Sequence, residues 1–476
     1  MTDPEPSLDF VHRAMGCMLG AAVGDALGAP FEFGPPGRYT ATFPKPVLGG
    51  SGEMIGGGGL GWAPGQFTDD TEMAVVVAES LLAHDGIDID DQLARFRAWG
   101  RAASDVGNLT REVLSSGLPA DQAAGAVLND RRGRHTAGNG SLMRAAPGAI
   151  RFALHGAEAT MAAGCTLSAV THADPLALWA VAAQHELIRT ALQGHDPLSA
   201  IPAVLLAMPA EVRAVYAPLL AADFAPAAPG PGNGSAMGAL AQAVWAVRTH
   251  AEFADAVTSV IDLGDDTDSV AAVTGALAGA RAGIGAIPSR WLTYVHGYLT
   301  GLDGASHRYD SLALQRLAHS LLGGEFGHDT EADEPLLQPA EITPGVWLTN
   351  RAGARTVPDH WAVVSLCRID DTMRKPTRRE AYLIDQPGDH NPALQHVVDD
   401  ALAAIEHFRA EGLDVAVHCY AGKSRTALVA ASWLMHQGST LGEAQAILRD
   451  TWPVAHFDNL SFLAELQRRD AAPRTG

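Results

Sequence analysis

Two acidic segments far apart in the chain place the strongest constraint on its fold. The first is Gln-Phe-Thr-Asp-Asp-Thr-Glu-Met at 66–73, and the second is Gly-Asp-Asp-Thr-Asp-Ser at 264–269. Each combines clustered carboxylates with hydroxyl groups, and each leads into a run of small apolar residues. Clustered carboxylates repel one another and resist burial unless a cation neutralises them. A fold that brings the two segments together therefore needs a positively charged partner between them.

The side chains of these segments are hard oxygen donors, which favour Mg²⁺, Mn²⁺ or Ca²⁺ over Zn²⁺. A simpler interpretation of each segment is a solvated helix N-terminus, since Asp and Thr are good caps and favour the positive end of the helix dipole. Either segment alone fits both interpretations. Because a helical domain could bring two such segments to one point, we interpret them together as a shared metal site.

The length and composition of the chain predict more than one globular domain. At 476 residues the chain exceeds the usual size of a single hydrophobic core. Its apolar fraction of 47% and charged fraction of 18% are typical of folded proteins. A net charge of −21 argues against bulk nucleic-acid binding and against an anionic membrane as the main partner.

The cysteines and the N-terminus indicate where the protein acts. The four cysteines are widely spaced and form no Cys-x-x-Cys pair, so neither a zinc site nor a disulfide framework is indicated. The first ten residues are acidic, unlike the start of a secretory signal. Apolar runs such as 176–183 are soon interrupted by charged residues and are too short to cross a bilayer. We expect a cytoplasmic protein with no membrane partner.

The first two thirds of the chain are predicted to be helical. Residues 15–30 are rich in Gly and Ala, so a helix here can pack closely on its neighbours, and Pro30 ends it. A long loop rich in Gly and Pro follows over residues 34–65. Helical periodicity then resumes, and no series of strands is expected within this region. The first domain is therefore predicted to be all-α, over residues 10–322.

Three further features of this region are candidates for function. Glu32 lies between two aromatic residues, so its carboxylate either is forced inward or projects from a loop. Gly-Asn-Gly-Ser at 138–141 fits a helix entry whose free N–H groups can hold a phosphate, although a capped turn is the more common structure. The tetrapeptide recurs at 232–235, and without a longer repeat around it we interpret the recurrence as coincidence. His172 is interpreted by default as a structural histidine.

Five motifs occur in a fixed order along this region. They are Gly-Asp-Ala-Leu-Gly at 24–28, Thr-Asp-Asp-Thr at 68–71, Gly-Asn-Gly-Ser-Leu-Met-Arg at 138–144, Thr-His at 171–172 and Gly-Asp-Asp-Thr-Asp at 264–268. In this order they resemble the ADP-ribosylglycohydrolases, the family that includes the enzyme reactivating ADP-ribosylated dinitrogenase reductase. The resemblance implies an all-helical fold with two divalent cations, Mg²⁺ or Mn²⁺, that hydrolyses an ADP-ribosyl linkage at the anomeric carbon.

The resemblance also implies roles for individual residues. By position, the metal ligands are Thr68, Asp69, Asp70, Asp266, Asp268 and Ser269. Glu32 matches a loop glutamate that can reach the metal. The contacts to ADP-ribose come from Asn139, Gly140, Ser141 and His172. Two positions depart from the family pattern: Asp265 replaces the usual Gly and adds a charge that could alter the metal preference, and Ser269 replaces Thr but keeps the hydroxyl.

These residue types suit the chemistry independently of the resemblance. Breaking an anomeric C–N or C–O bond builds positive charge on the ribose while water or hydroxide attacks. A paired metal site can bind the ribose hydroxyls and lower the pKa of a bound water. A nearby carboxylate can act as the base. The resemblance implies that Asp69, Asp266 and Glu32 belong to the catalytic set.

The composition changes after Leu322. Residues 323–339 are polar, acidic and turn-prone and are predicted to be a linker. A second domain over 340–470 is predicted to alternate strands with helices. Its strands are expected at 345–348, 361–366 and 415–418, and its helices at 397–408 and 427–435. This alternation predicts a smaller α/β domain.

The last predicted strand runs into Cys-Tyr-Ala-Gly-Lys-Ser-Arg-Thr at 419–426. N–H groups in a loop ahead of a helix N-terminus bind anions, and Arg425 can hold phosphate oxygens bidentately. The same field stabilises the Cys419 thiolate and makes it nucleophilic. A buried structural cysteine is the simpler alternative, but His-Cys-x5-Arg-Thr between a strand and a helix favours an anion site.

This segment resembles the signature of the cysteine-dependent tyrosine and dual-specificity phosphatases, and the resemblance covers residues 340–470. It implies that Cys419 takes the phosphoryl group without a cofactor, that Arg425 binds it and that Thr426 assists the leaving thiolate. The loop contacts to phosphate come from Gly422, Lys423 and Ser424.

The same resemblance places the general acid on a loop upstream of the cysteine. Asp385 and Asp389 both qualify. Asp385 fits better, because it ends the apolar run 382–384.

The sequence thus predicts a hydrolase with two active sites, one removing ADP-ribose from an ADP-ribosylated protein or small molecule and one hydrolysing a phosphorylated substrate. In one alternative, only the phosphatase is active and the helical domain binds ADP-ribose. The complete ligand set argues against it, because binding alone would tolerate losses. In another, both domains act in sequence on one nucleotide-type substrate. The linkage cleaved and the phosphatase substrate stay open.

Overall fold

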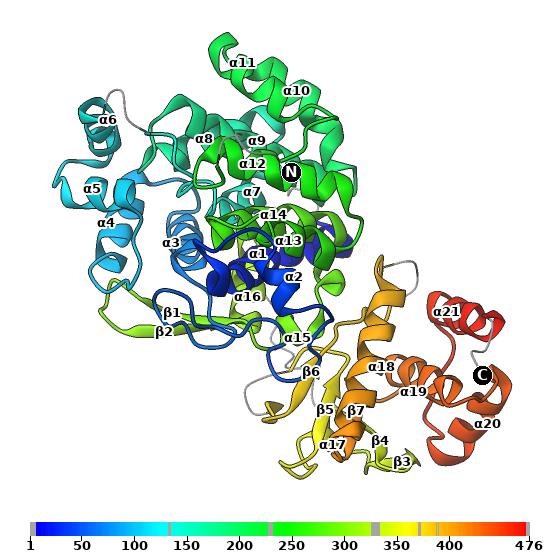
Figure 1. Cartoon of the computed structure of the whole chain (residues 1–476). Coiled ribbons are helices and arrows are strands. Elements are labelled where there is room, and N and C mark those ends of the chain that lie inside the picture. Colours follow the sequence, from blue (N-terminus) through cyan, green and yellow to red (C-terminus); the bar gives the residue numbers. More distant parts are fainter. Residues whose placement is uncertain are drawn as a thin grey trace. The chain divides into compact units, whose positions relative to one another are not determined.

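The computed structural model describes residues 6–131, 135–226, 232–324, 334–369, 373–386, 388 and 390–472. The chain divides into two compact units (Figure 1). The first, here called the helical unit, consists of Met1–Val47, Glu53–Ile287 and Tyr294–Phe326. The second, here called the sheet unit, consists of Leu48–Gly52, Pro288–Thr293 and Gly327–Gly476. Most of the predicted linker at 323–339 lies outside the described residues.

The helical unit is built almost entirely from α-helices. They are α1 (Leu8–Gly28), α2 (Arg38–Thr42), α3 (Asp69–Ala83), α4 (Ile89–Trp99), α5 (Asn108–Ser115), α6 (Ala120–Asp130), α7 (Ala146–Phe152), α8 (Ala157–Ala169), α9 (Pro175–Leu192), α10 (Ile201–Ala207), α11 (Ala210–Leu219), α12 (Ala236–Thr249), α13 (Phe253–Ile261), α14 (Thr267–Ala282) and α16 (Ser311–Leu321). The prediction of a helical first domain is confirmed.

One β-hairpin in the helical unit was not predicted. Strands β1 (His296–Thr300) and β2 (Ser306–Asp310) pair in antiparallel fashion. β2 is largely exposed and carries no apolar residue except Tyr309, so it lacks the alternation that marks a half-buried strand. The hairpin therefore gave no periodic signal in the sequence.

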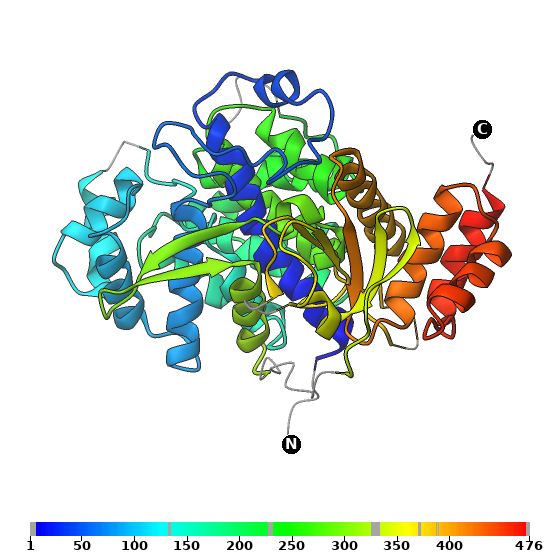
Figure 2. The ribbon, with the colours of Figure 1, turned by 90° about the horizontal axis from the view of Figure 1, so that it is seen from below.

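Helices α1 and α14 pack against each other in opposite directions along a line of small residues. Three glycines of α1, spaced four residues apart, would each overlap an α14 carbonyl oxygen if they carried a Cβ: Gly16, Gly20 and Gly24 meet Gly279, Gly275 and Ala271 in that order. Residues four apart lie on one helix face, so the spacing creates a continuous flat contact. Figure 2 shows α1, in blue, running among the green helices of the unit. The close packing predicted for the Gly- and Ala-rich residues 15–30 is confirmed.

The α1 segment also meets the length and composition expected of a membrane span. Over Leu8–Phe31 it is apolar enough to cross a bilayer, but every residue of its most apolar window is buried inside the protein. It is the central core helix of its unit, and Ser7 caps its start by accepting a hydrogen bond from the Phe10 N–H at 3.3 Å.

The sheet unit contains a five-stranded sheet. Its spatial order is β3 (Ala340–Thr343), β4 (Val346–Asn350), β7 (Val415–Cys419), β5 (Ala362–Ser365) and β6 (Arg378–Glu380). The β3–β4 pair is antiparallel and the other pairs are parallel. The helices of the unit are α15 (Ser289–Leu292), α17 (Arg351–Ala354), α18 (Leu394–Ala410), α19 (Ser424–His436), α20 (Leu441–Thr451) and α21 (Leu460–Ala471). All three expected strands and both expected helices are present, so the predicted α/β class is confirmed.

The central strand β7 positions the second candidate site. All five of its residues are buried, and it pairs with β4 on one side and β5 on the other. Val417 and Cys419 belong to the core that the sheet shares with α18 and α19. Cys419 is the last residue of the strand, and α19 begins five residues later. In open parallel sheets this carboxyl edge is where ligands bind.

Candidate functional site

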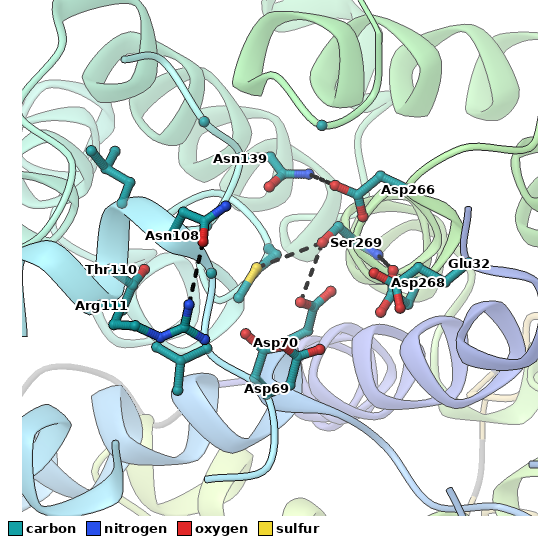
Figure 3. A pocket seen from close by; sticks show the side chains of 18 of the residues that line it. Glu32, Asp69, Asp70, Asn108, Thr110, Arg111, Asn139, Asp266, Asp268 and Ser269 are labelled. Carbon is teal, nitrogen blue, oxygen red and sulfur yellow. Dashed lines mark hydrogen bonds between the residues drawn. The ribbon is translucent and has the colours of Figure 1, made fainter. Parts of the chain in front are cut away.

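A cavity of about 450 Å³ in the helical unit is lined by side chains from both acidic segments. Figure 3 shows them converging, together with Glu32 from the loop after α1. The predicted ligands that line it are Asp69, Asp70, Asp266, Asp268 and Ser269. Two stretches separated by nearly two hundred residues therefore meet at one point, as the shared-site interpretation requires.

Two helix N-termini present these side chains. Asp69 and Asp70 open α3, while Asp268 and Ser269 lie in the first turn of α14. Ser269 Oγ donates a hydrogen bond to Asp70 Oδ1 at 3.3 Å, which links the two helices directly. The close packing of α1 on α14 sets this position, because a Cβ at Gly28 would overlap Asp268 Cα.

Asp25 of α1 holds the first turn of α3 in place. Its fully buried carboxylate accepts hydrogen bonds from the Thr68 N–H at 2.9 Å, the Thr71 N–H at 3.0 Å and the Thr71 hydroxyl at 2.6 Å. Burial raises the pKa of Asp25 to about 6, an effect that these hydrogen bonds partly oppose. Asp25 lies in the first of the five motifs, but sequence reasoning gave it no role.

Glu32 completes the acidic cluster. Carboxylate oxygens of Glu32, Asp266 and Asp268 all lie within 4.8 Å of one another. The loop that carries Glu32 is held by backbone hydrogen bonds: the Phe33 N–H donates to Asp265 O at 2.7 Å, and the Asp265 N–H donates to Gly34 O at 3.1 Å. The carboxylate of Glu32 thus faces inward, which settles the alternative left open by the sequence.

The carboxylates of this cluster are strongly perturbed. Burial first, and then the charges of neighbouring carboxylates, raise the pKa of Asp69, Asp70 and Asp268 well above its ordinary value. Burial, followed by the charge of Asp266, raises the pKa of Glu32 to about 7. Concentrated negative charge of this kind is unfavourable without a cation.

Two buried oxygens at the site have no hydrogen-bond partner among the described residues. They are Thr68 Oγ1 and Asp70 Oδ2, and both belong to the predicted ligand set. Buried polar atoms are normally paired, so an orphaned carboxylate oxygen and hydroxyl next to a carboxylate cluster point to a missing partner. The donors are all oxygens, which fits Mg²⁺ or Mn²⁺ rather than Zn²⁺.

The predicted contacts to ADP-ribose divide into two groups. Asn139, Gly140 and His172 line the cavity. Ser141 is turned to Ser168, whose hydroxyl donates to it at 2.8 Å. Helix α7 begins only at Ala146, with turns between, so the 138–141 tetrapeptide forms a turn, the more common of the two structures considered, and not a helix entry.

His172 is both structural and part of the cavity wall. Its Nδ1 lies 2.8 Å from Thr171 Oγ1, which in turn accepts a hydrogen bond from Arg144 at 2.6 Å. Burial, with the positive charge of Arg144 adding to it, lowers the pKa of His172 to about 3. The imidazole is therefore neutral at physiological pH.

The two Gly-Asn-Gly-Ser tetrapeptides lie side by side. Gly138 and Ser235 form an antiparallel bridge, and the Asn139 amide donates to Asn233 O at 2.8 Å and to Asp266 Oδ2 at 3.0 Å. Asn233 then holds the second acidic segment, accepting from the Asp266 N–H at 3.1 Å and donating to Gly264 O at 2.9 Å. Treating the recurrence as coincidence missed Asn233, and the repeated tetrapeptide was the signal that could have found it.

A second missed group lies on the opposite side of the cavity. Asp105 and the start of α5 line it, including Asn108, Thr110 and Arg111. Figure 3 shows Asn108 and Arg111 across from Asp266 and Asp268. The N-cap Gly107 has no side chain to cap α5, so the first N–H groups of this helix are available to an anion. The only signal of this segment in the sequence was a Gly followed by the polar residues at the start of a helix.

The sheet unit carries the second site at the end of β7. Cys419 is 1% exposed, and Arg425 lies in the first turn of α19 with its Nη1 donating to Leu383 O at 3.2 Å. Three buried polar atoms of the first turn of α19 have no hydrogen-bond partner among the described residues: Ser424 Oγ, Arg425 Nε and Thr426 Oγ1. Lys423 gives α19 no side-chain cap. These free donors fit a bound oxyanion.

The loop before α19 is shaped by its neighbours. Gly422 has a positive φ of 72°, and its carbonyl accepts a hydrogen bond from Trp452 Nε1 at 2.7 Å. His418 Nε2 lies 2.7 Å from Ser365 Oγ, and burial, with the charge of Arg425 adding to it, lowers the pKa of His418 to about 4. A neutral, buried histidine thus anchors the end of β7 beside Cys419.

Asp385 lines a cavity of about 490 Å³ together with Lys423 and Ser424 of the loop. Asn459 contributes to the same cavity. The alternative general acid, Asp389, lies outside the described residues. Asp385 therefore shares a cavity with Lys423 and Ser424, whereas Cys419 and Arg425 do not line it.

Comparisons with known proteins agree with this division. Residues 6–328 match the ADP-ribosylglycohydrolase family, and residues 362–469 match the dual specificity phosphatase catalytic domain. ADP-ribosylarginine hydrolase Tri1 of Pseudomonas putida (strain GB-1) is 33% identical, over 61% of this chain and 76% of its own. A solved structure described as an ADP-ribosylglycohydrolase-related protein complex is 34% identical, with a TM-score of 0.53, over 66% of this chain and 98% of its own.

For the C-terminal part, Dual specificity protein phosphatase 1 of Arabidopsis thaliana is 33% identical, over 27% of this chain and 67% of its own. Both families consist of hydrolases. The chain belongs to the ADP-ribosylglycohydrolase family and carries, after its glycohydrolase domain, a dual-specificity phosphatase catalytic domain.

Proposed function

We propose that the helical unit is a divalent-metal-dependent hydrolase that releases ADP-ribose from an ADP-ribosylated substrate, and that the sheet unit hydrolyses phosphomonoesters through Cys419. One observation carries the first part. Ser269 of α14 bonds to Asp70 of α3 inside a cavity that also gathers the carboxylates of Glu32, Asp266 and Asp268. This arrangement is costly without cations and typical of a paired metal site.

The two sides of the cavity suit the two ends of ADP-ribose. The uncapped start of α5 and Arg111 offer donors to the diphosphate. The oxygen cluster on the other side would hold two divalent cations, with Thr68, Asp69, Asp70, Asp266, Asp268 and Ser269 as ligands. When bound, such cations would lower the pKa of a water and so supply the nucleophile.

The protein's own groups keep that water and the ribose in place. Asn139 donates a hydrogen bond to Oδ2 of Asp266, so the other carboxylate oxygen of Asp266 is left for a metal. Glu32, whose carboxylate lies within 4.8 Å of those of Asp266 and Asp268, can take a proton from the attacking water. His172 stays neutral and closes the wall beside Gly140 without adding a charge.

We propose arginine as the ADP-ribosylated residue. Asp105 lines the cavity outside the proposed ligand set, and its carboxylate complements a guanidinium leaving group better than a serine hydroxyl or an acetyl ester. The similarity to a hydrolase of ADP-ribosylarginine agrees with this choice.

The test is the release of free ADP-ribose from matched substrates that are modified on arginine, on serine, as an acetyl ester or on nucleic acid. Each is incubated with the full chain in EDTA, Mg²⁺ or Mn²⁺. We expect release that needs metal and is fastest from arginine. Asp266→Asn should abolish it, whereas Asp255→Asn, a change of the same kind at an exposed residue of α13 that does not line the cavity, should not. Binding of ADP-ribose without release from any substrate would favour a binding module instead.

For the sheet unit, the supporting observation is the group of free donors beside Cys419. In the proposed reaction the Cys419 sulfur attacks phosphorus and the bond from phosphorus to the leaving oxygen breaks. That oxygen takes a proton from Asp385, and Arg425 holds the phosphoryl oxygens. Water then releases phosphate from sulfur and returns the proton to Asp385. Any phosphomonoester that reaches the loop is a candidate substrate.

A further inference from the structure

Asn459, between α20 and α21, forms hydrogen bonds that link the last helix of the sheet unit to the segment carrying Asp385. The residues Asp385, Gln386 and Gly388 of that segment are here called the strip. Asn459 is the N-cap of α21, and its Oδ1 accepts a hydrogen bond from the Phe462 N–H at 3.3 Å. A cap needs this one oxygen only. The amide nitrogen of Asn459 is therefore free for a second task.

The amide nitrogen of Asn459 points to the strip. Nδ2 donates to Asp385 Oδ1 at 3.3 Å and to Gln386 O at 3.3 Å. The orientation of the amide is fixed by its backbone partners, because the Phe462 N–H can only donate and the Gln386 carbonyl can only accept. Exchanging the oxygen and nitrogen would break both bonds.

A second side chain from the start of α21 holds the same strip. Ser461 Oγ donates to Gly388 O at 3.0 Å. Together the two side chains bind the strip at both ends, and Asp385 and Asn459 line the cavity that also contains Lys423 and Ser424. Asn459 thus both caps α21 and donates a hydrogen bond to the carboxyl group beside the phosphate loop.

We propose that Asn459 is a positioning residue for the general acid Asp385. This proposal rests on the phosphatase function proposed above. Because the amide donates to Oδ1, the proton of the carboxyl group sits on Oδ2. In the phosphoryl-transfer step that proton moves from Oδ2 to the leaving oxygen as its bond to phosphorus breaks and the bond from Cys419 sulfur forms.

The consequence is a dependence on the leaving group. Dinitrophenyl phosphate releases a weakly basic phenolate that needs no proton, whereas phenyl phosphate releases a basic one that does. A mispositioned acid should slow only the hydrolysis of phenyl phosphate. A role of Asn459 in folding alone would slow both substrates equally, since both need the same phosphate loop.

The experiment measures kcat of the full chain on both substrates. Asn459→Ser keeps a capping oxygen but is too short to reach Asp385, and Asn459→Asp keeps the cap but loses the donor and adds a charge. Thr440→Ala, which removes the capping box of α20, is the control for a lost helix cap away from the strip. Asp385→Asn removes the acid, and Cys419→Ser removes the nucleophile.

We expect Asn459→Ser and Asn459→Asp to lower kcat on phenyl phosphate roughly ten-fold or more, because loss of a general acid costs roughly 100-fold and a mispositioned acid should cost part of that. On dinitrophenyl phosphate, kcat should stay within about two-fold of the wild-type value. Thr440→Ala should change neither rate.

Equal losses on both substrates, or no loss on phenyl phosphate, would overturn the positioning role. If Asp385→Asn also shows no leaving-group dependence, Asp385 is not the acid and the proposal falls with it. Failure of the phosphatase function itself is separate, because then wild type and Cys419→Ser would be indistinguishable on both substrates.

Discussion

Gly20 of α1 and Gly275 of α14 touch backbone to backbone: each would overlap the other's carbonyl oxygen if it carried a Cβ. The same contact continues to Gly28, whose missing side chain lets α1 reach the Asp268 backbone at the start of α14. The helix pair thus sets the distance at which Asp25 on α1 and the acidic first turn of α14 meet α3. The proposed metal site depends on this close approach.

Gly20→Ala should therefore be strongly destabilising although Ala is the better helix former. The added methyl group must push the two helices apart, and overpacking of this kind costs about 1–3 kcal/mol in the free energy of unfolding. Gly125→Ala in α6 is the matched control, because a Cβ there meets nothing within 4 Å. It should raise the free energy of unfolding by about 0.5–1 kcal/mol. Urea unfolding of both variants measures the difference, and equal effects would contradict the close contact.

Asn233→Ala should weaken metal binding without removing a ligand. The change leaves the Asp266 N–H and the Gly264 carbonyl without their side-chain partner. Loss of such an outer partner lowers metal affinity by about 10–100-fold. Ser235→Ala, in the same tetrapeptide, removes the cap of α12 and should cost about 1 kcal/mol of stability with metal affinity intact. Titration calorimetry with Mn²⁺ compares them, and equal affinities would argue against this role for Asn233.

The rise in melting temperature that metal produces should grow with pH. In the metal-free protein, burial raises the pKa of Asp25 to about 6 and that of Glu32 to about 7, and it raises the pKa of Asp70 well above its ordinary value. The folded state therefore keeps protons that the unfolded chain has lost, so its stability falls as pH rises from the ordinary values near 4 through the raised ones.

Bound metal should remove much of this loss of stability at higher pH, because it favours the charged form of the carboxylates. Buried histidines such as His172 change stability in the opposite direction, but equally with and without metal, so they cancel in the difference. Melting temperatures at pH 5.5 and 7.5, each in EDTA and in saturating Mg²⁺, give the comparison. A metal-induced rise that is larger at pH 5.5 would be the opposite of what we expect.

Cys419→Ser should abolish phosphatase activity on an aryl phosphate and leave release of ADP-ribose largely intact. The serine hydroxyl is a far weaker nucleophile than a thiolate, and each site draws its residues from its own unit. The two activities are assayed on one preparation of the folded variant. Comparable loss of both would show that the sites are not independent.

Much of this molecule could be predicted because its signals are local. The strand–loop–helix around Cys419 and the acidic starts of α3 and α14 each lie within one short segment, and Gly- and Ala-rich periodicity indicated close helix packing. The sequence could not show that α1 packs on α14, since many helices of this chain carry small residues at helical spacing.

The residues that were missed act through tertiary contacts. Asn233 and Asp25 hold the acidic segments from other elements, and nothing in their own segments indicates which backbone they bind. Asp105 and α5 reach the cavity from a stretch with little pattern of its own. The second tetrapeptide was visible, but its role needed the pairing of Gly138 with Ser235.

Thermal melting of the full chain with EDTA or Mg²⁺ tests the shared metal site most directly, on wild type, Asp266→Asn and the control Asp255→Asn. A ligand that binds only the folded state stabilises it by about 2.7 kcal/mol at roughly 100 times its dissociation constant. We predict a clear rise in melting temperature for wild type and Asp255→Asn in Mg²⁺ and the loss of most of it in Asp266→Asn. Coincident wild-type curves, together with release of ADP-ribose that survives chelation, would contradict the shared metal site.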